Sequence, residues 1–456
     1  MKSSSRYHFT IHTYGCKVNT YDTGLLQKRL ESKGHEAVDA KAVAPPIETQ
    51  FGLGARIPRI HILNTCAVTG EATREAAKAV RRLKAKDPFS TVVVTGCGAQ
   101  VDGETFDTLT GADLVIANSH KGDLENILDR HFRNELESRV FRSNIFRKDD
   151  LEAGGGNERE HTRSFLKIQD GCNSFCTYCV IPFARGKSRS IPVNELVKRV
   201  NELSKQGTRE VVLTGVHIGD YEDGAMVLHD LVRAVLERTT IERIRLSSLE
   251  PVELTPELLA LYKLSDRLCP HFHMSIQSAN TRILSLMRRK YTAEDVESAL
   301  NRIQEFVPGA FVGMDVIVGF PGETNDEFAD TYERLAKLPW TRIHVFPYSE
   351  RPGTKAAAFE GVVSRDQRSL RSQRLRELST QRMTEMAQQQ LKQTKQVLLL
   401  NFPGNGPDGL SRDYWPVRVV DAPEDRRGSE VTIEITGFEN PHASRMDGVL
   451  VGRVLV

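Results

Sequence analysis

The chain has 456 residues, which exceeds one ordinary hydrophobic core and predicts two or three domains. Hydrophobic residues at 39% and charged residues at 27% are typical of globular proteins, and a formal net charge of +2 does not by itself indicate nucleic-acid binding. No apolar run approaches the roughly 18 residues that span a bilayer, and the first residues lack the apolar core of a secretion signal. We therefore expect a cytoplasmic protein without a membrane partner, in which seven cysteines favour metal or redox chemistry over disulfides.

Residues 6–140 alternate between short apolar runs and helical patterns. Because parallel neighbours need a crossover connection, this alternation predicts an α/β fold with a doubly wound parallel sheet. Strands are expected at 6–16, 59–66 and 90–97, and helices at 23–34 and 71–87. The segment 42–58 has paired prolines and little periodicity, which predicts a surface loop.

One cysteine follows each of these three expected strands. They are Cys16, Cys66 and Cys97. Sheets of this kind gather their reactive residues in loops beyond the carboxyl ends of the strands. We therefore expect the three thiols to converge on one crevice, with three unrelated core thiols as the alternative.

A Gly-rich, charged segment at 146–160 predicts a linker between an N-terminal domain at 1–145 and a second domain at 161–390. The second domain contains six apolar runs with a helical pattern between each and the next. This pattern predicts a parallel sheet that curls into a partial or full (β/α) barrel, with its active site at the carboxyl edge. The strands are expected at 164–172, 210–215, 243–250, 271–278, 310–320 and 342–349.

The end of the chain changes character twice. Residues 364–396 predict a long helix with eight Lys/Arg against three Asp/Glu, which indicates either a solvated face or a surface near an anion. The remaining domain, 391–456, is β-rich and predicts a small all-β, OB-like barrel. From residue 397 onward it carries six Lys/Arg against nine Asp/Glu, so bulk charge would not attract RNA to it.

Three further cysteines lie within eight residues, at Cys172, Cys176 and Cys179. Zinc would need a fourth protein ligand, and no Cys or His stands at ligand spacing beside this set. A redox dithiol would use only two of the three thiols. A four-iron cluster uses all three and leaves one iron open for a small molecule.

The spacing C-x3-C-x2-C, with Tyr178 before the last cysteine, resembles the signature of radical S-adenosylmethionine enzymes. The segment CNSFCTYCVIPFARGKSRS closely resembles that of the methylthiotransferases, whose plan of an N-terminal three-cysteine domain, a radical domain and a β-rich TRAM module is also matched. GCKVN and MRRKYT are similar to members that act on N6-threonylcarbamoyladenosine in tRNA. Other similar motifs are ILNTCAVTGEATREAAKAVRR, VVVTGCGAQ, LTGVHIGDY, SLEPVEL, DVIVGFPGET and HVFPYSERPGT.

The resemblance implies two [4Fe-4S] clusters that face each other, one on each three-cysteine set. The cluster of the C-x3-C-x2-C motif would bind S-adenosylmethionine, whose one-electron cleavage gives a radical that abstracts hydrogen from C2 of the adenine. The auxiliary cluster would hold a sulfur species, and a methylthio group would be placed at C2 of N6-threonylcarbamoyladenosine at position 37, in the tRNA anticodon loop. The resemblance also implies an electron donor such as flavodoxin or ferredoxin.

Further site residues are expected from the same motifs. Tyr178, Gly215 and Gln277 are candidates for contacts with S-adenosylmethionine, against the alternatives of cluster shielding, a chain turn and a structural amide. Basic residues near the motifs are candidates for tRNA phosphate contacts, against simple solvation. These are Arg185, Lys187, Arg189, Arg288, Arg289 and Lys290.

Some features depart from the family or stand apart from its motifs. Ala279 and Asn280 replace the Gly-Ser that relatives tend to have, and Cys269 is expected to be a buried small hydrophobe. Other substrates open to the same chemistry are isopentenyladenosine in tRNA and an aspartate of a ribosomal protein. Different classes of function are an iron–sulfur electron carrier and an RNA-binding scaffold with structural cysteines.

Overall fold

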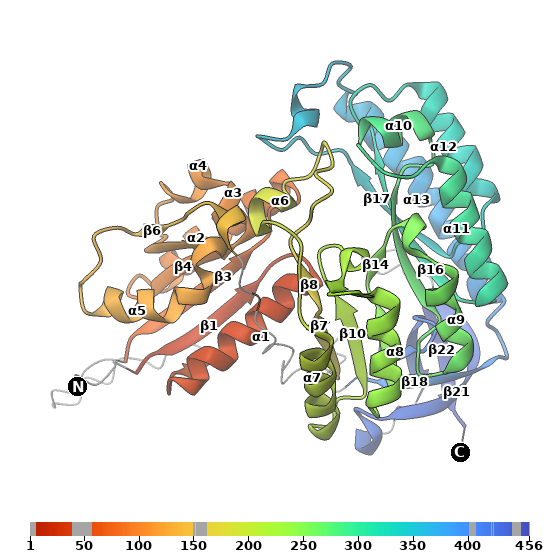
Figure 1. The fold of residues 1–456 in the computed structure, drawn as a ribbon, viewed down its shortest axis with the longest axis horizontal. Coiled ribbons are helices and arrows are strands. Elements are labelled where there is room, and N and C mark those ends of the chain that lie inside the picture. Colours follow the sequence, from red (N-terminus) through yellow and green to blue (C-terminus); the bar gives the residue numbers. More distant parts are fainter. Residues whose placement is uncertain are drawn as a thin grey trace.

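A computed structural model describes residues 6–38, 57–148, 151, 162–400, 407–420, 422, 424–439 and 448–455. The expected surface loop at 42–58 and the expected linker at 146–160 lie for the most part outside the described residues. Figure 1 shows three parts: an N-terminal α/β sheet, a larger α/β sheet, and a C-terminal barrel below the larger sheet. None of the described helices combines the length and apolarity that crossing a bilayer requires.

The N-terminal part is a six-stranded parallel sheet with the order β2-β1-β3-β4-β5-β6, which confirms the predicted class. Its strands are β1 (His8–Thr13), β2 (Glu36–Ala37), β3 (Arg59–Thr65), β4 (Thr91–Gly96), β5 (Leu114–Ala117) and β6 (Val140–Phe141). Its helices are α1 (Lys17–Ser32), α2 (Gly70–Lys86), α3 (Cys97–Val101), α4 (Gly103–Phe106), η1 (Asn118–Asp123), α5 (Leu124–Phe132) and η2 (Ile145–Arg147). The sequence pattern had not specified β2, β5 and β6.

Two hydrophobic cores flank this sheet, because successive residues of a buried strand point to opposite faces. On β4, Val93 packs in the core that α1 and α5 cover, whereas Val92 and Val94 pack in the core that α2 and α4 cover. The prediction that the first helix starts near residue 23 was wrong, since α1 starts at Lys17 and buries Val18 and Tyr21. The start of the helix matters because it places Cys16 at the N-cap.

The larger sheet contains all six expected strands, and their pairings are parallel. The strand expected at 243–250 divides into β13 and β14, which gives the orders β13-β10-β7 and β14-β15-β16-β17. Within the described residues β7 and β17 do not pair, so the barrel is partial. The strands are β7 (Arg163–Lys167), β10 (Glu210–Thr214), β13 (Arg243–Leu246), β14 (Ser248–Leu249), β15 (His271–Gln277), β16 (Phe311–Val318) and β17 (Arg342–Pro347).

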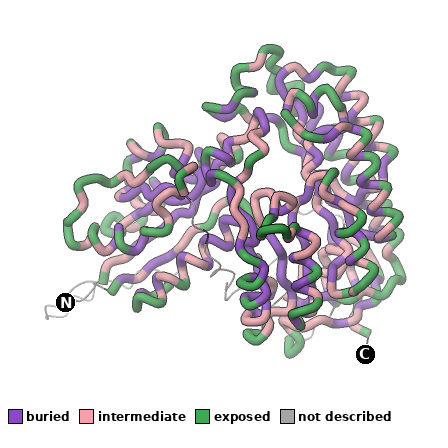
Figure 2. The backbone as a smooth tube through the Cα atoms, viewed as in Figure 1, coloured by how far each residue is buried: buried purple, intermediate pink, exposed green. Residues whose placement is uncertain are grey.

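Helices follow each strand of the larger sheet and bury one face against it (Figures 1 and 2). The α-helices are α6 (Ile181–Arg185), α7 (Val193–Lys205), α8 (Leu228–Arg238), α9 (Pro256–Leu264), α10 (Thr281–Leu286), α11 (Ala293–Phe306), α12 (Asn325–Lys337) and α13 (Arg365–Gln388). The short elements are β8 (Gln169–Asp170), β9 (Arg189–Ser190), η3 (Ile218–Asp220), β11 (Glu222–Asp223), β12 (Met226–Val227), η4 (Pro251–Glu253) and η5 (Lys355–Ala358). The β8 and β9 pair is antiparallel and frames the three-cysteine loop.

The helix expected over 364–396 ends earlier than predicted, at Gln388. Lys392 adopts a left-handed φ of 64° and its amide donates to the Ile435 carbonyl at 2.8 Å, so the chain turns into the barrel. Some basic residues of α13 form contacts inside the protein. Neither of the two predictions for this helix, a solvated face or a surface near an anion, included such contacts. Arg371 pairs with Glu323 at 2.6 Å, and Arg382 donates to two backbone carbonyls at the end of α12.

The C-terminal part is a closed five-stranded barrel, as the β-rich, OB-like prediction expected. Its strands are β18 (Thr394–Leu399), β19 (Gly409–Ser411), β20 (Pro416–Val420), β21 (Glu430–Glu439) and β22 (Val449–Val454). The barrel packs on the amino ends of the larger sheet, where Arg243 donates to the Leu410 and Ser411 carbonyls at 3.1 and 2.9 Å. The carboxyl edge therefore lies at the other end of the sheet from the barrel (Figure 1).

Candidate active site

The carboxyl edges of the two α/β sheets meet. Arg351, which follows β17, pairs with Asp102 of the N-terminal part. Asn118, which follows β5, donates to the Ala184 carbonyl on α6 at 2.9 Å. Loops from both sheets are therefore held in one region, as Figure 1 shows around α6 and α3.

The first three cysteines lie together at the edge of the N-terminal sheet. Cys16 caps α1, Cys66 follows β3 and Cys97 begins α3. Gly15 adopts a left-handed φ of 98°, and a Cβ added there would lie 2.8 Å from the Cys66 sulfur. Burial, with repulsion from the nearby Cys97 and Cys16 thiolates, raises the pKa of the Cys66 thiol to about 11. The three thiols lie near one another at this edge, and their joint use as ligands stays a prediction.

The second three cysteines lie in the loop between β8 and α6, and each sulfur has at least one hydrogen-bond donor beside it. The Ser174 amide donates to Cys172 at 3.4 Å, and the Ile181 amide donates to Cys179 at 3.4 Å. The Arg289 guanidinium donates to the Cys176 sulfur at 3.1 Å. Donors aimed at sulfur stabilise the thiolate, which is the form that binds metal.

Both sets suit a multi-iron cluster better than a single ion. Zinc binds sulfur at about 2.3 Å, so one tetrahedral ion would draw its sulfurs close together. Among the described residues, no three cysteines bring their sulfurs within 4.8 Å of one another. Burial, with repulsion from Cys176, raises the pKa of Cys179 to about 12, so a bound cation would stabilise the thiolate of this residue.

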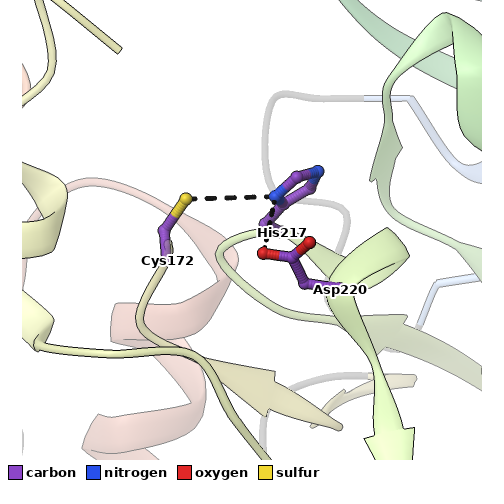
Figure 3. Close-up of side chains that lie close together, drawn as sticks. All are labelled: Cys172, His217 and Asp220. Atoms are coloured by element: carbon purple, nitrogen blue, oxygen red, sulfur yellow. Dashed lines mark hydrogen bonds and ion pairs between the residues drawn. The ribbon is translucent and has the colours of Figure 1, made fainter. Parts of the chain in front are cut away.

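A histidine that the sequence interpretation missed links the second set to a carboxylate network. His217 Nδ1 lies 3.9 Å from the Cys172 sulfur and 3.1 Å from Asp220, as Figure 3 shows. Its Nε2 lies 3.3 Å from Glu250 and hydrogen-bonds Glu253. Burial alone would lower the pKa of His217, but these hydrogen bonds raise it well above its usual value. The imidazolium form therefore faces Cys172 and lowers the pKa of that thiol against the effect of burial.

The residues of this network belong to the motifs LTGVHIGDY and SLEPVEL. The sequence analysis had selected only Gly215 from these two motifs. The histidine follows β10 and the two glutamates follow β14. Both strands end at the carboxyl edge, beside the loop that carries Cys172, Cys176 and Cys179, called the cluster loop below. Polar residues at such strand ends were the available clue.

Two of the six predicted tRNA contacts were wrong, because their side chains are buried and ion-paired. Arg289 lies against Glu250 at 2.7 Å and Cys176, with its side chain 6% exposed. Arg185, 3% exposed, is clasped by Asp170 at 2.9 Å and by Asp22 of the other sheet at 3.1 Å. Neither guanidinium is available to a phosphate.

The other four basic residues lie nearer the surface. Lys187, Arg288 and Lys290 are exposed at the carboxyl edge. Arg189 is half-buried, and its guanidinium donates to the carbonyls of Lys148 and Arg185, both at 2.8 Å. Three exposed cations are thus left at the edge where both cysteine sets lie.

The predicted cofactor residues have different surroundings. Tyr178, within the loop that carries Cys172, Cys176 and Cys179, packs edge-on against Phe320. Gly215 allows close packing on Gln169, since a Cβ there would lie 2.9 Å from the Gln169 carbonyl oxygen. Gln277 ends β15 with a left-handed φ of 61°, a conformation that is uncommon for a residue with a Cβ and is often found at functional sites.

The two departures from the family pattern have structural uses. Asn280 caps α10, with its side-chain oxygen accepting from the Ile283 amide at 3.1 Å, a role that serine also performs. Ala279 is 1% exposed and packs in the hydrophobic core of the larger sheet. Cys269 is buried as expected.

The two cysteine sets are close to each other. Val180, the residue after Cys179, and Ala184 of α6 pack with Ala67 and Cys97 in one small apolar cluster. The α6 segment of the radical motif thus lies directly against the cysteine loops of the N-terminal sheet. This arrangement agrees with two clusters that face each other.

Comparison with known proteins gives two family matches. Residues 166–335 match the Radical SAM superfamily, and residues 53–117 match the uncharacterized protein family UPF0004. Among solved structures, the radical S-adenosylmethionine methyltransferase TsrM of Kitasatospora setae, which contains cobalamin and a [4Fe-4S] cluster, has a TM-score of 0.57 at 16% identity over 77% of each chain. That likeness concerns the fold.

Curated relatives cover most of the chain. A threonylcarbamoyladenosine tRNA methylthiotransferase of Aquifex aeolicus is 40% identical over 76% of this chain and 81% of its own length, and that of Bacillus subtilis is 35% identical over 80% and 78%. A tRNA-2-methylthio-N(6)-dimethylallyladenosine synthase of Thermodesulfovibrio yellowstonii is 32% identical over 79% and 80%. The chain therefore belongs to the radical S-adenosylmethionine methylthiotransferases.

Proposed function

We propose that this enzyme places a methylthio group on C2 of N6-threonylcarbamoyladenosine at position 37 of tRNA. The observation that carries this proposal is the apolar cluster that holds both Cys97 of the first set and Val180, the neighbour of Cys179. Methylthio transfer needs a carbon radical and a sulfur source side by side, and each set accounts for one of them. The substrate follows the relatives of Aquifex aeolicus and Bacillus subtilis, which are named for threonylcarbamoyladenosine.

The cofactors of this family are S-adenosylmethionine and [4Fe-4S] clusters. When bound, one cluster would supply the electron that cleaves S-adenosylmethionine, and the auxiliary cluster would supply the sulfur that is transferred. Cys172, Cys176 and Cys179 would hold one cluster. Cys16, Cys66 and Cys97 would hold the auxiliary cluster. Each set supplies three thiolates and so leaves one iron open for a small molecule.

Other side chains of the chain orient this site. Arg289 directs its charge to Cys176 and is held in place by Glu250. His217 directs its charge to Cys172 and is held in place by Glu253. Positive charge beside a cluster favours its reduced, more negative form. Gln277 ends β15 in a strained, left-handed conformation, which places this residue at the carboxyl edge where S-adenosylmethionine would bind.

The tRNA anticodon loop would approach the carboxyl edge, where Lys187, Arg288 and Lys290 are exposed. Phosphate contacts from such residues position the nucleic acid without reading its sequence. The C-terminal barrel packs at the opposite end of the larger sheet and carries more acidic than basic residues. We therefore assign anticodon binding to the carboxyl edge.

The reaction also needs a reductant, because cleavage of S-adenosylmethionine consumes one electron. We propose a small electron-transfer protein such as flavodoxin or ferredoxin, in the cytoplasm. The cluster loop supports access from outside, since Asn173 is exposed beside half-buried Cys172. The docking partner would approach that side of the loop.

Nucleoside mass spectrometry of tRNA from cells that lack this protein tests the substrate. The proposal predicts loss of 2-methylthio-N6-threonylcarbamoyladenosine, with its unmethylthiolated precursor accumulating. Loss of the methylthio group from isopentenyladenosine instead would assign the sibling tRNA activity. An unchanged nucleoside profile with an altered ribosomal-protein mass would assign the protein-modifying activity.

A further inference from the structure

The N-terminal part is attached to both edges of the open larger sheet. Within the described residues β7 and β17 do not pair with each other, so a gap separates the first and last strands of the partial barrel. Asp22 of α1 pairs at 2.7 Å with Lys167, which ends β7, and Asp102 pairs with Arg351, which follows β17. The N-terminal part therefore spans this gap, with an ion pair at each side.

The ion pair beyond β17 is buried. The Arg351 side chain is 5% exposed and that of Asp102 is 11% exposed. Thr73 of α2 donates to Asp102 at 2.6 Å and accepts from Arg351 at 3.4 Å, and beside them the Gly70 amide donates to the Ser349 hydroxyl at 3.4 Å. Salt screens a buried pair little, and loss of one partner leaves the other charge buried without compensation. The contact is therefore a firm attachment between the two sheets.

On the N-terminal side, the attachment holds two helices that lie next to cysteine loops. Asp102 directly follows α3, the helix that begins with Cys97. Thr73 lies near the start of α2, the helix that follows the loop of Cys66. A displacement of Asp102 and Thr73 would therefore displace these two cysteines of the first set.

On the other side, the segment that carries Arg351 is bonded to the cluster loop. The Arg351 carbonyl accepts from the Thr354 hydroxyl at 2.7 Å. Two residues later, the Ala356 amide donates to the carbonyl of Thr177, which lies inside the cluster loop, at 2.8 Å. Arg351 thus connects the first cysteine set to the second, by a route separate from the apolar cluster on α6.

The two attachments together restrain a movement that one alone would permit. Parts of a chain that are joined by few contacts generally move relative to each other. The contacts of Asp22 and of α6 belong to segments that follow β7 or end it, whereas that of Arg351 lies beyond β17. Attachment on both sides of the gap opposes rotation of one sheet against the other. Such restraint matters for a transfer reaction, since a misplacement of about 1 Å can lower its rate about a hundredfold.

We propose that Arg351 is a positioning residue, whose ion pair with Asp102 holds the first cysteine set at a fixed distance from the second. Arg351 acts through the loops that it joins and not on the substrate. The proposal rests on the methylthio transfer proposed above for the use of this geometry. The geometry itself is measured without tRNA.

The first test uses the full-length chain with both clusters reconstituted and reduced. The magnetic interaction between the two reduced clusters, seen by electron paramagnetic resonance, falls steeply with their separation. Arg351→Met is expected to weaken this interaction while iron content stays near eight per chain. Asp102→Asn is expected to do the same, and the double variant no more, because both changes remove one contact. Arg351→Lys keeps the charge and should lie between the parent and Arg351→Met.

A second measurement separates positioning from folding. With S-adenosylmethionine and dithionite but without tRNA, Arg351→Met should form 5′-deoxyadenosine as the parent does. With tRNA, this variant should form at least about tenfold less methylthiolated product for each 5′-deoxyadenosine. A residue that only stabilised the fold would lower both products together.

Arg334→Met is the matched control. Arg334 of α12 pairs with Asp330 and with Glu294 of α11, both at 3.1 Å and both within the larger sheet, so its loss should leave both measurements unchanged. The proposal is overturned if Arg351→Met and Asp102→Asn keep the magnetic interaction of the parent, if Arg334→Met weakens it equally, or if iron content and 5′-deoxyadenosine fall together. Absence of product from the parent would refute the tRNA assignment, and the magnetic interaction would still decide the role of Arg351.

Discussion

Val180 packs against Cys97, and Val180 is the residue that follows Cys179. This contact joins two cysteine sets that belong to different sheets. The chain reaches it because both sheets turn their carboxyl edges toward α6. The two cysteine sets thus lie on either side of one small apolar cluster, and the following predictions test whether each set binds its own cluster.

Iron content should separate the two sets. After anaerobic reconstitution we expect about eight irons per chain, and about four when Cys16, Cys66 and Cys97 are replaced by alanine. The reason is that each set binds its own cluster. Colorimetric iron analysis of both triple-alanine variants checks this, and a variant that keeps about eight irons would contradict it.

Arg289→Met should impair the radical cluster without weakening tRNA binding. The substitution removes a charge-assisted hydrogen bond to Cys176, worth about 1.5–3 kcal/mol, and should lower the reduction potential of that cluster. A redox titration measures the potential. The matched variant Arg288→Met lies next to it but is exposed, and should leave the potential unchanged.

The exposed basic residues at the carboxyl edge, unlike Arg289, should contribute to tRNA binding. Replacing Lys187, Arg288 and Lys290 with glutamine should weaken tRNA binding and make it less dependent on salt, by at most about 0.9 in slope for each phosphate that is no longer neutralised. Fluorescence anisotropy at several salt concentrations measures this. An unchanged salt slope would remove these residues from the tRNA surface.

Glu210→Gln should destabilise the junction between the larger sheet and the barrel. The Glu210 carboxylate is fully buried and pairs with Arg163, Arg243 and Arg245. Its loss leaves Arg243 with Glu430 as its ion-pair partner and takes from the buried Arg245 the carboxylate that neutralises it. We expect the free energy of unfolding to fall by about 3–5 kcal/mol. Glu439→Gln, in an exposed pair with Arg418, should cost less than about 1 kcal/mol in the same urea denaturation.

His61 should make stability depend on pH. Burial lowers the pKa of His61 to about 4, with the neighbouring His12 contributing, so the folded state favours the neutral ring. The contribution to the free energy of unfolding is therefore complete above about pH 6.5 and is lost as pH falls toward 4. Denaturation between pH 7 and 4 should show a shallower loss for His61→Gln than for the parent. Equal slopes would show that His61 does not titrate in this way.

Local patterns predicted most of the fold. The alternation of apolar strands and helices along 164–349 indicated every strand of the larger sheet, because buried parallel strands and amphipathic helices are local features. The break between β13 and β14, the early start of α1 and the docking of the barrel on the amino ends have no local pattern. They depend on tertiary packing.

The site was predictable where its residues are chemically distinctive. Cysteines at strand ends and in a short loop identify themselves by type and spacing. Arg185 was assigned to the surface because its partners are not local: Asp170 lies 15 residues away and Asp22 lies 163 residues away. His217 was missed because a single histidine after a strand has many ordinary roles.

Cleavage of S-adenosylmethionine by the variant with alanine at Cys172, Cys176 and Cys179 tests the central claim most directly. With dithionite as reductant, we expect no 5′-deoxyadenosine above background from this variant, while its auxiliary cluster keeps about four irons per chain. The parent protein should form 5′-deoxyadenosine under the same conditions. Undiminished 5′-deoxyadenosine from the variant would contradict the assignment of the two cysteine sets to separate clusters with separate roles.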